Sequence, residues 1–396
     1  MQRRAPARPP CAEAGEERLE LPRERQWHYE FDRTLQRSSH AVSSTAFSQD
    51  GRLMFSGSGA GDVKVWDTLS WTEAGVMRGC RGEDVCSLAV SPFQRWLLVV
   101  QHTALHVFRC EAPWCQEHSA PPPGDGVQPD ALALMTTASR WCCAVFSPAA
   151  AIAKQGGHHS HMQYIAALST GHLCVTDFSA GGAGGVSRRT HSLPSLARHT
   201  CLAYTPCGSW IVCGSEDGHM HIWNAHLLIL ERTLLSDCAL RCLTTSPPGA
   251  AYESRLITGG SASSLRVWNP SAWTLELMVS DPLSGRTAVH SCAFSATGSW
   301  LVSAGKHLCV WRACLDRGGR LSLLLHQRLE DACGAQGLRA LAVRGQDDSV
   351  GVGSCDGLLG LWTRRPGPPG APATPEGPPA PERRALAPCG GHPRSP

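Results

Sequence analysis

Nineteen cysteines and eighteen histidines are the residues of this 396-residue chain whose types could bind a metal. Zinc sites built from such residues repeat a short spacing, typically CxxC twice. No CxxC pair occurs, and the close pairs Cys110/Cys115 and Cys238/Cys242 have no matching second half-site. Many cysteines lie within apolar runs, where a free thiol behaves as a small hydrophobic group. The spacing favours neither a zinc site nor a disulfide framework, and we expect a reducing compartment, cytoplasmic or nuclear.

His158, His159 and His161 form a compact group that could hold a transition metal. The group lies in an Ala- and Gly-rich stretch that offers no partner side chains to orient the imidazoles. We therefore expect a solvated loop there, with no metal and no other cofactor.

The chain lacks the short motifs that carry catalytic chemistry. Neither a GxSxG nucleophile turn nor an HExxH metal pair occurs. Gly181–Val186 is glycine-rich, but no helical pattern follows it that could hold a phosphate at a helix N-terminus. These absences predict a protein that is not an enzyme, and they leave binding as the function to look for.

Basic side chains, the candidates for binding, recur at fixed offsets within seven short apolar runs. The runs align on Phe47, Val90, Phe146, Tyr204, Thr245, Phe294 and Val343. Arg140 and Arg198 lie six residues before the aligned residue, and Arg241, His290 and Arg339 lie four before it. Arginine is the charged residue most favoured at binding hot spots. If the runs are equivalent strands, these five side chains share one face of the molecule.

The elements that must position them are short strands and tight turns. Leu202–Asn224 (LAYTPCGSWIVCGSEDGHMHIWN) contains three apolar or alternating runs, separated by Pro206-Cys207-Gly208 and by Glu216-Asp217-Gly218. This is the pattern of successive β-hairpins. Because such a meander cannot bury both of its faces alone, copies of it are expected elsewhere in the chain.

Seven copies are found, and each closes on an aromatic residue. The closing residues are at positions 66, 108, 178, 223, 268, 311 and 362, so five of the six gaps lie between 42 and 51 residues. The remaining gap of 70 residues holds two insertions, Glu111–Gln128 and Ala149–His161, whose composition predicts loops. A period of this length fits four short strands with their turns.

These copies resemble the WD-repeat β-propeller family over residues 27–364. The resemblance rests on Ala-Phe-Ser at 46–48, Gly-Ser and Asp-Gly in the turns, and the terminal Val-Lys-Val-Trp-Asp at 63–67. It implies an all-β fold, a single seven-bladed β-propeller of four-stranded blades around a central channel. The residues that match the family's structural signature are Trp66, Asp67, Asp217, Trp223, Trp268, Trp311, Asp356 and Trp362.

The resemblance also gives these signature residues expected roles. The tryptophans should wedge between neighbouring blades, and the aspartates should bond backbone N–H groups in their turns. In the family the aspartate also orients a His, Ser/Thr and Trp network. That network looks incomplete here, because only His40 is near the family's His position and its copy carries Ala60 in place of the aspartate.

The seventh copy has no fourth strand of its own, since RRPGPPGAP follows Trp362 almost at once. The β-like segment Trp27–Leu35 has no neighbour beside it in sequence, so we expect this N-terminal strand to close the last blade. The predicted organisation is residues 26–364 as one propeller, flanked by disordered segments 1–25 and 365–396.

The resemblance makes a non-enzymatic interaction scaffold, or an adaptor subunit of a multiprotein complex, the leading hypothesis. Arg140, Arg198, Arg241, His290 and Arg339 would form a basic rim at the channel mouth for an acidic or phosphorylated peptide. Their alternative role is packing and pairing with local carboxylates.

Other functions remain open at this stage. A substrate-recognition subunit of a ubiquitin ligase is one, although no blade end carries the usual Trp-Asp-x-Arg. A propeller hydrolase or lactonase would need carboxylates gathered in the channel. Nucleic-acid binding would need a basic stripe with stacking aromatics, and only four Tyr and eight Phe occur. We expect a monomer within a larger complex, without membrane contact.

The C-terminal segment contains a PxxPxR pattern at Pro378, Pro381 and Arg383. Such a pattern fits the groove of an SH3 domain, which favours a preformed polyproline helix. A Pro-rich tail also produces this pattern by chance, so it stays a possible SH3 ligand.

Overall fold

The computed structural model describes residues 27–77, 82–92, 96–110, 116–120, 140–148, 161–179, 190–193, 198–281, 287–316, 318–329, 337–345 and 348–366. Tyr29–Arg364 forms one compact unit. Residues 1–28 group with 365–396 as a second unit, of which only 27, 28, 365 and 366 are described. None of the described residues forms a helix that is long and apolar enough to span a membrane.

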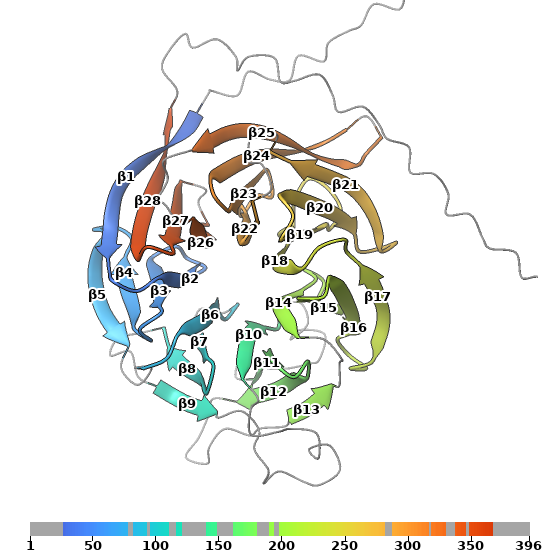
Figure 1. Ribbon diagram of the computed structural model, residues 1–396, viewed down its shortest axis with the longest axis horizontal. Coiled ribbons are helices and arrows are strands. Elements are labelled where there is room, and N and C mark those ends of the chain that lie inside the picture. Colours follow the sequence, from blue (N-terminus) through green and yellow to red (C-terminus); the bar gives the residue numbers. More distant parts are fainter. Residues whose placement is uncertain are drawn as a thin grey trace, which may run out of the picture. The chain divides into compact units, whose positions relative to one another are not determined.

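All regular elements of the described chain are strands, grouped in seven four-stranded sheets that form the blades of a propeller (Figure 1). Blade 1 is β2 (Val42–Phe47), β3 (Leu53–Ser58), β4 (Val63–Asp67) and β5 (Thr72–Met77); blade 2 is β6 (Val85–Val90), β7 (Trp96–Gln101), β8 (Leu105–Arg109) and β9 (Gln116–Ala120). Blade 3 is β10 (Trp141–Phe146), β11 (His161–Leu168), β12 (Leu173–Ser179) and β13 (Thr190–Leu193); blade 4 is β14 (His199–Tyr204), β15 (Trp210–Ser215), β16 (His219–Asn224) and β17 (Leu230–Leu235). Blade 5 is β18 (Leu240–Thr245), β19 (Leu256–Gly260), β20 (Ser264–Asn269) and β21 (Thr274–Ser280); blade 6 is β22 (Ser291–Phe294), β23 (Trp300–Ala304), β24 (Leu308–Leu315) and β25 (Leu321–Leu329). Blade 7 is β26 (Leu338–Val343), β27 (Ser349–Ser354), β28 (Leu358–Pro366) and β1 (Trp27–Arg37).

The predicted closure of the ring is confirmed. The seventh sheet has the order β1-β28-β27-β26, so the N-terminal strand is its outermost member. The side chain of Gln327 in blade 6 holds this strand from the other side: its Oε1 accepts from Tyr29 N at 2.7 Å and its Nε2 donates to Tyr29 O at 2.8 Å. Tyr29 is buried. The side chain of Gln327 therefore joins blades 6 and 7 through two hydrogen bonds to the backbone of Tyr29, as a neighbouring strand would.

The hydrophobic core lies between adjacent blades. Trp66 packs with Val42, Met54 and Leu359, and so contacts both blade 1 and blade 7. Trp268 of blade 5 packs with blade 4 residues such as Met220. Each closing tryptophan in these two clusters covers a face that its own blade could not bury alone.

Three closing tryptophans also hydrogen-bond a hydroxyl two residues beyond their partner on the second strand. Trp66 Nε1 donates to Ser56 Oγ at 2.9 Å, Trp268 Nε1 to Thr258 Oγ1 at 3.0 Å, and Trp311 Nε1 to Ser303 Oγ at 2.9 Å. In blade 4 the equivalent position is Cys213, and the buried Nε1 of Trp223 has no hydrogen-bond partner among the residues that the structure describes. One part of the family's polar network therefore forms in some blades and is missing in another.

Blade 3 differs from its prediction at the closing position. The register pairs Phe146 with Tyr164 and Tyr164 with Thr176, so Thr176 stands where the other blades have their aromatic residue. Phe178 lies two residues further along β12 and pairs with Met162. The prediction of Phe178 as the closing residue is wrong, because strand register rather than the nearest aromatic sets the position. The aromatic Tyr164 is buried at the facing position.

The first insertion is also not entirely a loop. β9 lies within the predicted loop Glu111–Gln128 and supplies the outermost strand of blade 2. An outermost strand needs few apolar residues, because one of its edges faces solvent. The sequence of β9, QEHSA, therefore has no hydrophobic pattern that would predict a strand. The described part of the second predicted loop contributes only His161, the first residue of β11.

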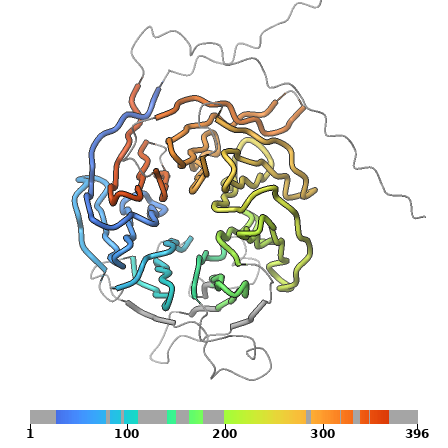
Figure 2. Tube along the Cα trace, viewed as in Figure 1, coloured from blue at the N-terminus to red at the C-terminus, as the bar shows by residue number. Residues whose placement is uncertain are grey.

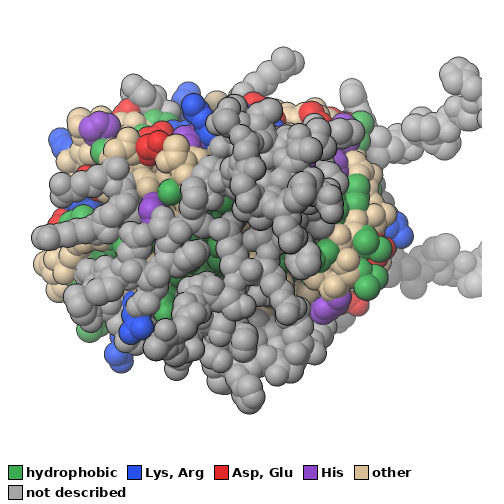
Figure 3. Space-filling view, turned by 90° about the horizontal axis from the view of Figure 1, so that it is seen from below, with side chains coloured by type: hydrophobic (Ala, Val, Ile, Leu, Met, Phe, Trp, Pro, Cys, Tyr) green, Lys and Arg blue, Asp and Glu red, His purple; other side chains and the backbone are tan. Residues whose placement is uncertain are grey.

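The outer strands carry most of the large apolar side chains that are exposed, among them Leu230 and Leu235 of β17 and Met278 of β21. Figure 3 shows hydrophobic side chains at the right-hand rim, interspersed with charged ones. The second strands of the blades, such as β7, β19, β23 and β27, are buried throughout, whereas the innermost strands are only partly buried and surround the channel.

Candidate functional site

The central feature is a ring of side chains at the N-terminal ends of the innermost strands. In β2, β6, β10, β14, β18 and β26 the pairing register skips one residue near this end. Such a bulged residue has no partner on the neighbouring strand, and the bulge changes the direction in which its side chain points. In blade 6 the corresponding residue lies directly before β22. We call this set the mouth ring: Ser43, Cys86, Cys142, Thr200, Arg241, His290 and Arg339.

All members of the mouth ring line one cavity of about 220 Å³ at the centre of the propeller. Figure 2 shows the innermost segments of the seven blades surrounding this centre. The sequence offset of four residues therefore corresponds to a real position in space. It brings together Arg241, His290 and Arg339, three of the five predicted binding residues.

The mouth ring is neutral over blades 1 to 4. The hydroxyl of Ser43 donates to Val85 O, and Thr200 Oγ1 donates to Leu240 O at 2.6 Å, so each hydroxyl proton is engaged with the next blade. Burial raises the pKa of the Cys86 thiol to about 12 and also raises the pKa of Cys142. These thiols stay protonated at neutral pH and are poor nucleophiles.

The mouth ring is cationic over blades 5 to 7. Arg241 Nη1 lies 3.4 Å from His290 Nδ1, and neither Arg241 nor Arg339 forms an ion pair with any described residue. Burial, and then the charges of Arg241 and Arg339, lower the pKa of the half-buried His290. Two guanidinium groups without a counter-charge on one side of a polar cavity form a site that attracts anions.

Arg140 and Arg198 do not line this cavity. Both are exposed, just before β10 and β14. Arg198 Nη1 lies 3.6 Å from Glu216 Oε2, and its guanidinium opposes the rise in the pKa of Cys142 that burial causes. Arg198 thus lies near the ring but is partly neutralised, and the backbone N–H of Arg140 bonds Ser169 Oγ at 3.0 Å.

The sequence reasoning passed over the four neutral members of the mouth ring. Ser43, Cys86, Cys142 and Thr200 occupy the same offset as Arg241, and this offset was the signal that could have found them. These four side chains are uncharged, so a pattern of basic residues does not include them.

The opposite ends of the innermost strands have different chemistry. A second cavity of about 380 Å³ lies there between blades 3, 4 and 5, lined by apolar residues that include Phe146, Pro206 and Pro247. Tyr204 also lines it, and its hydroxyl donates to Gln163 Oε1 at 3.1 Å. The two ends of the channel therefore differ in their lining, which is polar at one end and mostly apolar at the other.

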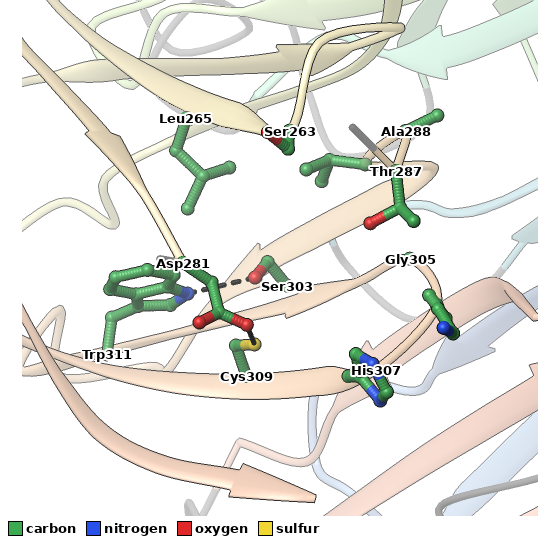
Figure 4. A pocket seen from close by; sticks show the side chains of 12 residues that line it. Ser263, Leu265, Asp281, Thr287, Ala288, Ser303, Gly305, His307, Cys309 and Trp311 are labelled. Carbon is green, nitrogen blue, oxygen red and sulfur yellow. Dashed lines mark hydrogen bonds between the residues drawn. The ribbon is translucent and has the colours of Figure 1, made fainter. Parts of the chain in front are cut away.

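A third, small pocket lies between blades 5 and 6 (Figure 4). Asp281 and Cys309 face each other in it, with Sγ 3.7 Å from Oδ2, beside the Trp311–Ser303 hydrogen bond. Its volume of about 30 Å³ is the space of one water molecule. A pocket of this size can hold a structural water but no organic substrate.

Within the part of the chain that the structure describes, no three His, Cys, Asp or Glu side chains are arranged to hold a metal ion. His158 and His159 lie outside the described residues, and the side chain of His161 is not described. The predicted SH3 ligand (Pro378, Pro381 and Arg383) and the predicted disordered segment 1–25 also lie outside them. Of the predicted disordered segment 365–396, Arg365 and Pro366 belong to strand β28, and the rest lies outside the described residues.

Two aspartates of the signature, Asp217 and Asp356, lie in the turns between the second and third strands of blades 4 and 7. Asp217 Oδ1 accepts from His219 N at 3.1 Å and from the hydroxyl of Ser215. Burial acts to raise the pKa of Asp217, but these hydrogen bonds outweigh it and lower the pKa. Asp356 occupies the equivalent turn of blade 7, and Asp67 Oδ1 caps the turn after Trp66 by accepting from Ser70 N at 2.8 Å.

Blade 4 contains a pair of histidines, buried His199 and half-buried His221, that the sequence did not single out. His199 is fully buried, and neither of its ring nitrogens has a hydrogen-bond partner of normal geometry among the described residues. Its ring centre lies 5.4 Å from that of His221. Burial, and then the charge of His221, lower the pKa of His199 to about 4. The other blades have an apolar residue at this position, for example Val42 and Leu240.

This pair should make stability depend on pH. The folded pKa of His199 lies below the unfolded value of 6.5, so the unfolded chain binds more protons in between. Stability is then complete above about pH 6.5 and falls as the pH drops towards 4, by about 3 kcal/mol for His199 alone. Urea unfolding at several pH values measures this loss.

His199→Leu should make the free energy of unfolding less dependent on pH, because leucine does not titrate and is apolar like the residues at this position in the other blades. His226→Gln, at an exposed turn of the same blade, serves as the matched control and should keep it. An unchanged slope in His199→Leu would show that other groups cause the acid sensitivity.

Comparison with known proteins agrees with this architecture. The family model of the WD domain, G-beta repeat (WD40), matches residues 30–67, 190–224 and 279–312. The crystal structure of the Myceliophteria thermophila Cps50 (Swd1) β-propeller domain superposes with a TM-score of 0.65 at 18% identity, covering 85% of this chain and 99% of that one. At this identity the likeness concerns the fold alone. No curated protein matches the sequence.

Proposed function

We propose that this chain, a WD-repeat protein with a seven-bladed β-propeller fold, is a non-enzymatic scaffold that binds an acidic or phosphorylated peptide of a partner protein at the mouth ring. A propeller with WD40 repeats fits a protein-interaction role. The observation that carries the finer proposal is the pair Arg241 and Arg339, which face one cavity without a carboxylate partner among the described residues.

The chemistry of arginine supports this class of partner. Guanidinium groups present several N–H donors in a planar fork that matches carboxylate and phosphate oxygens. Two such groups close together, without a counter-charge, repel each other, so an anion between them is stabilised by both. Asp and Glu side chains or a phosphorylated residue of a partner would supply that anion.

The lining of the mouth cavity argues against catalysis. The residues that line it include no Asp and no Glu, so it lacks the carboxylates that a propeller hydrolase or lactonase would use. The raised thiol pKa values make Cys86 and Cys142 poor nucleophiles. Binding without chemistry is the role that these residues suit.

Affinity capture from cell lysate followed by mass spectrometry tests the proposal. The double variant Arg241→Glu/Arg339→Glu should lose the partners that the wild-type chain recovers, at least tenfold by peptide intensity. Both side chains are exposed, so the melting temperature should stay near that of the wild type.

Arg232→Glu is the matched control, because Arg232 is exposed on the outermost strand β17, away from the channel. This variant should recover partners normally. Full recovery by the double variant would reject the mouth ring as the binding site. Recovery of ubiquitin-ligase subunits with the wild type would identify the narrower role of a substrate-recognition subunit.

A further inference from the structure

The contact between Arg241 and His290 defines the protonation state of the histidine. Nη1 of Arg241 lies 3.4 Å from Nδ1 of His290. A guanidinium group can only donate, so Nδ1 must present a lone pair, and the ring proton of the neutral imidazole is on Nε2. In the unliganded mouth ring His290 is therefore a neutral acceptor beside a cation.

The surroundings of His290 explain why it stays neutral. Arg241 on β18 and Arg339 on β26 flank it, and Lys306 and His307 lie in the turn that follows β23, its partner strand. Among the described residues, no Asp or Glu lines the cavity that it faces. Cations on both sides, together with partial burial, hold the pKa of His290 below its usual value.

Building on the proposed function, we propose that binding of an anion at the mouth ring is coupled to the uptake of one proton by His290. A bound carboxylate would offset the charges of Arg241 and Arg339 and would favour the imidazolium form. Protonated Nδ1 can no longer accept from Arg241, which becomes available to the anion. The site thereby changes from two cations to three when its ligand arrives.

The sign of the coupling follows from linkage. The ligand raises the pKa of His290, so the complex binds more protons than the free protein between the free and bound pKa values. Affinity for an anion must then increase as the pH falls through that window. A shift of about one pKa unit corresponds to about tenfold tighter binding.

The test needs a probe whose own charge is constant. Glu carboxylates have a pKa of about 4.3 and stay ionised between about pH 8 and about pH 6, whereas a phosphate monoester titrates near pH 6. We would measure the Kd of a fluorescein-labelled oligoglutamate peptide by anisotropy at several pH values in this range, at constant ionic strength. Only the lower end of this range, below about pH 6.5, overlaps the acid loss of stability expected from His199, and most of that loss falls at lower pH.

For the wild type, the Kd should fall about tenfold from pH 8 to pH 6. His290→Gln should bind with a Kd that is nearly independent of pH, because glutamine can accept from Arg241 but cannot take up the proton. His226→Gln, at an exposed position outside the cavity, should keep the full pH dependence. Calorimetry in two buffers of different ionisation enthalpy should show proton uptake for the wild type and for His226→Gln, but not for His290→Gln.

The outcomes separate this inference from the proposed function. Peptide binding without pH dependence, or with pH dependence retained in His290→Gln, overturns the proton coupling and leaves the anion site standing. Absence of peptide binding at every pH overturns both.

Discussion

Deletion of residues 26–36 should leave the protein insoluble or aggregated. These residues form most of β1, the outermost strand of blade 7, and the deletion exposes the edge of β28. It also removes buried Tyr29 and its two hydrogen bonds to Gln327. Because one blade would be incomplete and the ring open, the loss should exceed the roughly 5–15 kcal/mol that keeps an ordinary domain folded. Soluble yield and a thermal melt measure the effect.

Two single substitutions should reduce stability less than the deletion does, and they serve as comparisons for it. Thr34→Ala, at an exposed position of the same strand, should be soluble and melt like the wild type. Gln327→Ala removes both bonds to Tyr29 but leaves the strand, and should cost about 1–3 kcal/mol. A deletion variant that is soluble with an unchanged melting curve would show that β1 is not needed to close the ring.

Trp268→Ala should be strongly destabilising, at about 3–5 kcal/mol. Trp268 is buried between blades 4 and 5, and its Nε1 bonds Thr258 Oγ1 at 3.0 Å. Trp268→Phe keeps part of the apolar area but leaves the buried Thr258 hydroxyl without this donor, which adds about 1–3 kcal/mol. Urea unfolding measures both variants.

Trp223 provides the matched comparison, because its buried Nε1 has no partner. Trp223→Phe loses similar area but removes an unsatisfied N–H, so it should cost less than Trp268→Phe. Cys213→Ser places a hydroxyl where blades 1, 5 and 6 carry Ser or Thr, and the gain in stability should vanish in Cys213→Ser/Trp223→Phe. Equal costs for the two phenylalanine variants would show that the tryptophan–hydroxyl bond contributes nothing to stability.

Much of the fold could be predicted because blade geometry imposes a period on the chain. Four short strands with tight turns fix the distance from one closing tryptophan to the next, and residues such as Trp223, Trp268 and Trp311 keep that distance. The role of β1 could also be predicted, because the seventh copy lacks a fourth strand and needs one from elsewhere in the chain.

The wrong or missing predictions concern segments whose side chains do not indicate a strand or its register. The outermost strands β9 (Gln116–Ala120) and β13 (Thr190–Leu193) are short and polar, so no hydrophobic pattern marks them. Blade 3 closes on Thr176, because register and not residue type determines the position. The insertions Glu111–Gln128 and Ala149–His161 lie on the two sides of β10 and removed the regular spacing that located the other strands.

The candidate site was partly predictable for a similar reason. Arg241, His290 and Arg339 were found because they share an offset within equivalent strands. Arg140 and Arg198 share a different offset, two residues earlier, and so lie outside the cavity. Two observations needed the structure: the missing counter-charge of the arginines and the contact of Arg241 with His290.

The strand bulges beneath the mouth ring have a consequence for how such a protein can change over evolutionary time. A bulged residue such as Cys86 or Arg241 takes no part in the ladder of its blade, so replacing it breaks no strand pairing. Six blades each contribute one such position to the same opening. Substitutions there can alter the charge and shape of the opening one blade at a time while the β-sheets persist. The fold thus separates the residues that keep the ring together from those that are open to selection for a new partner.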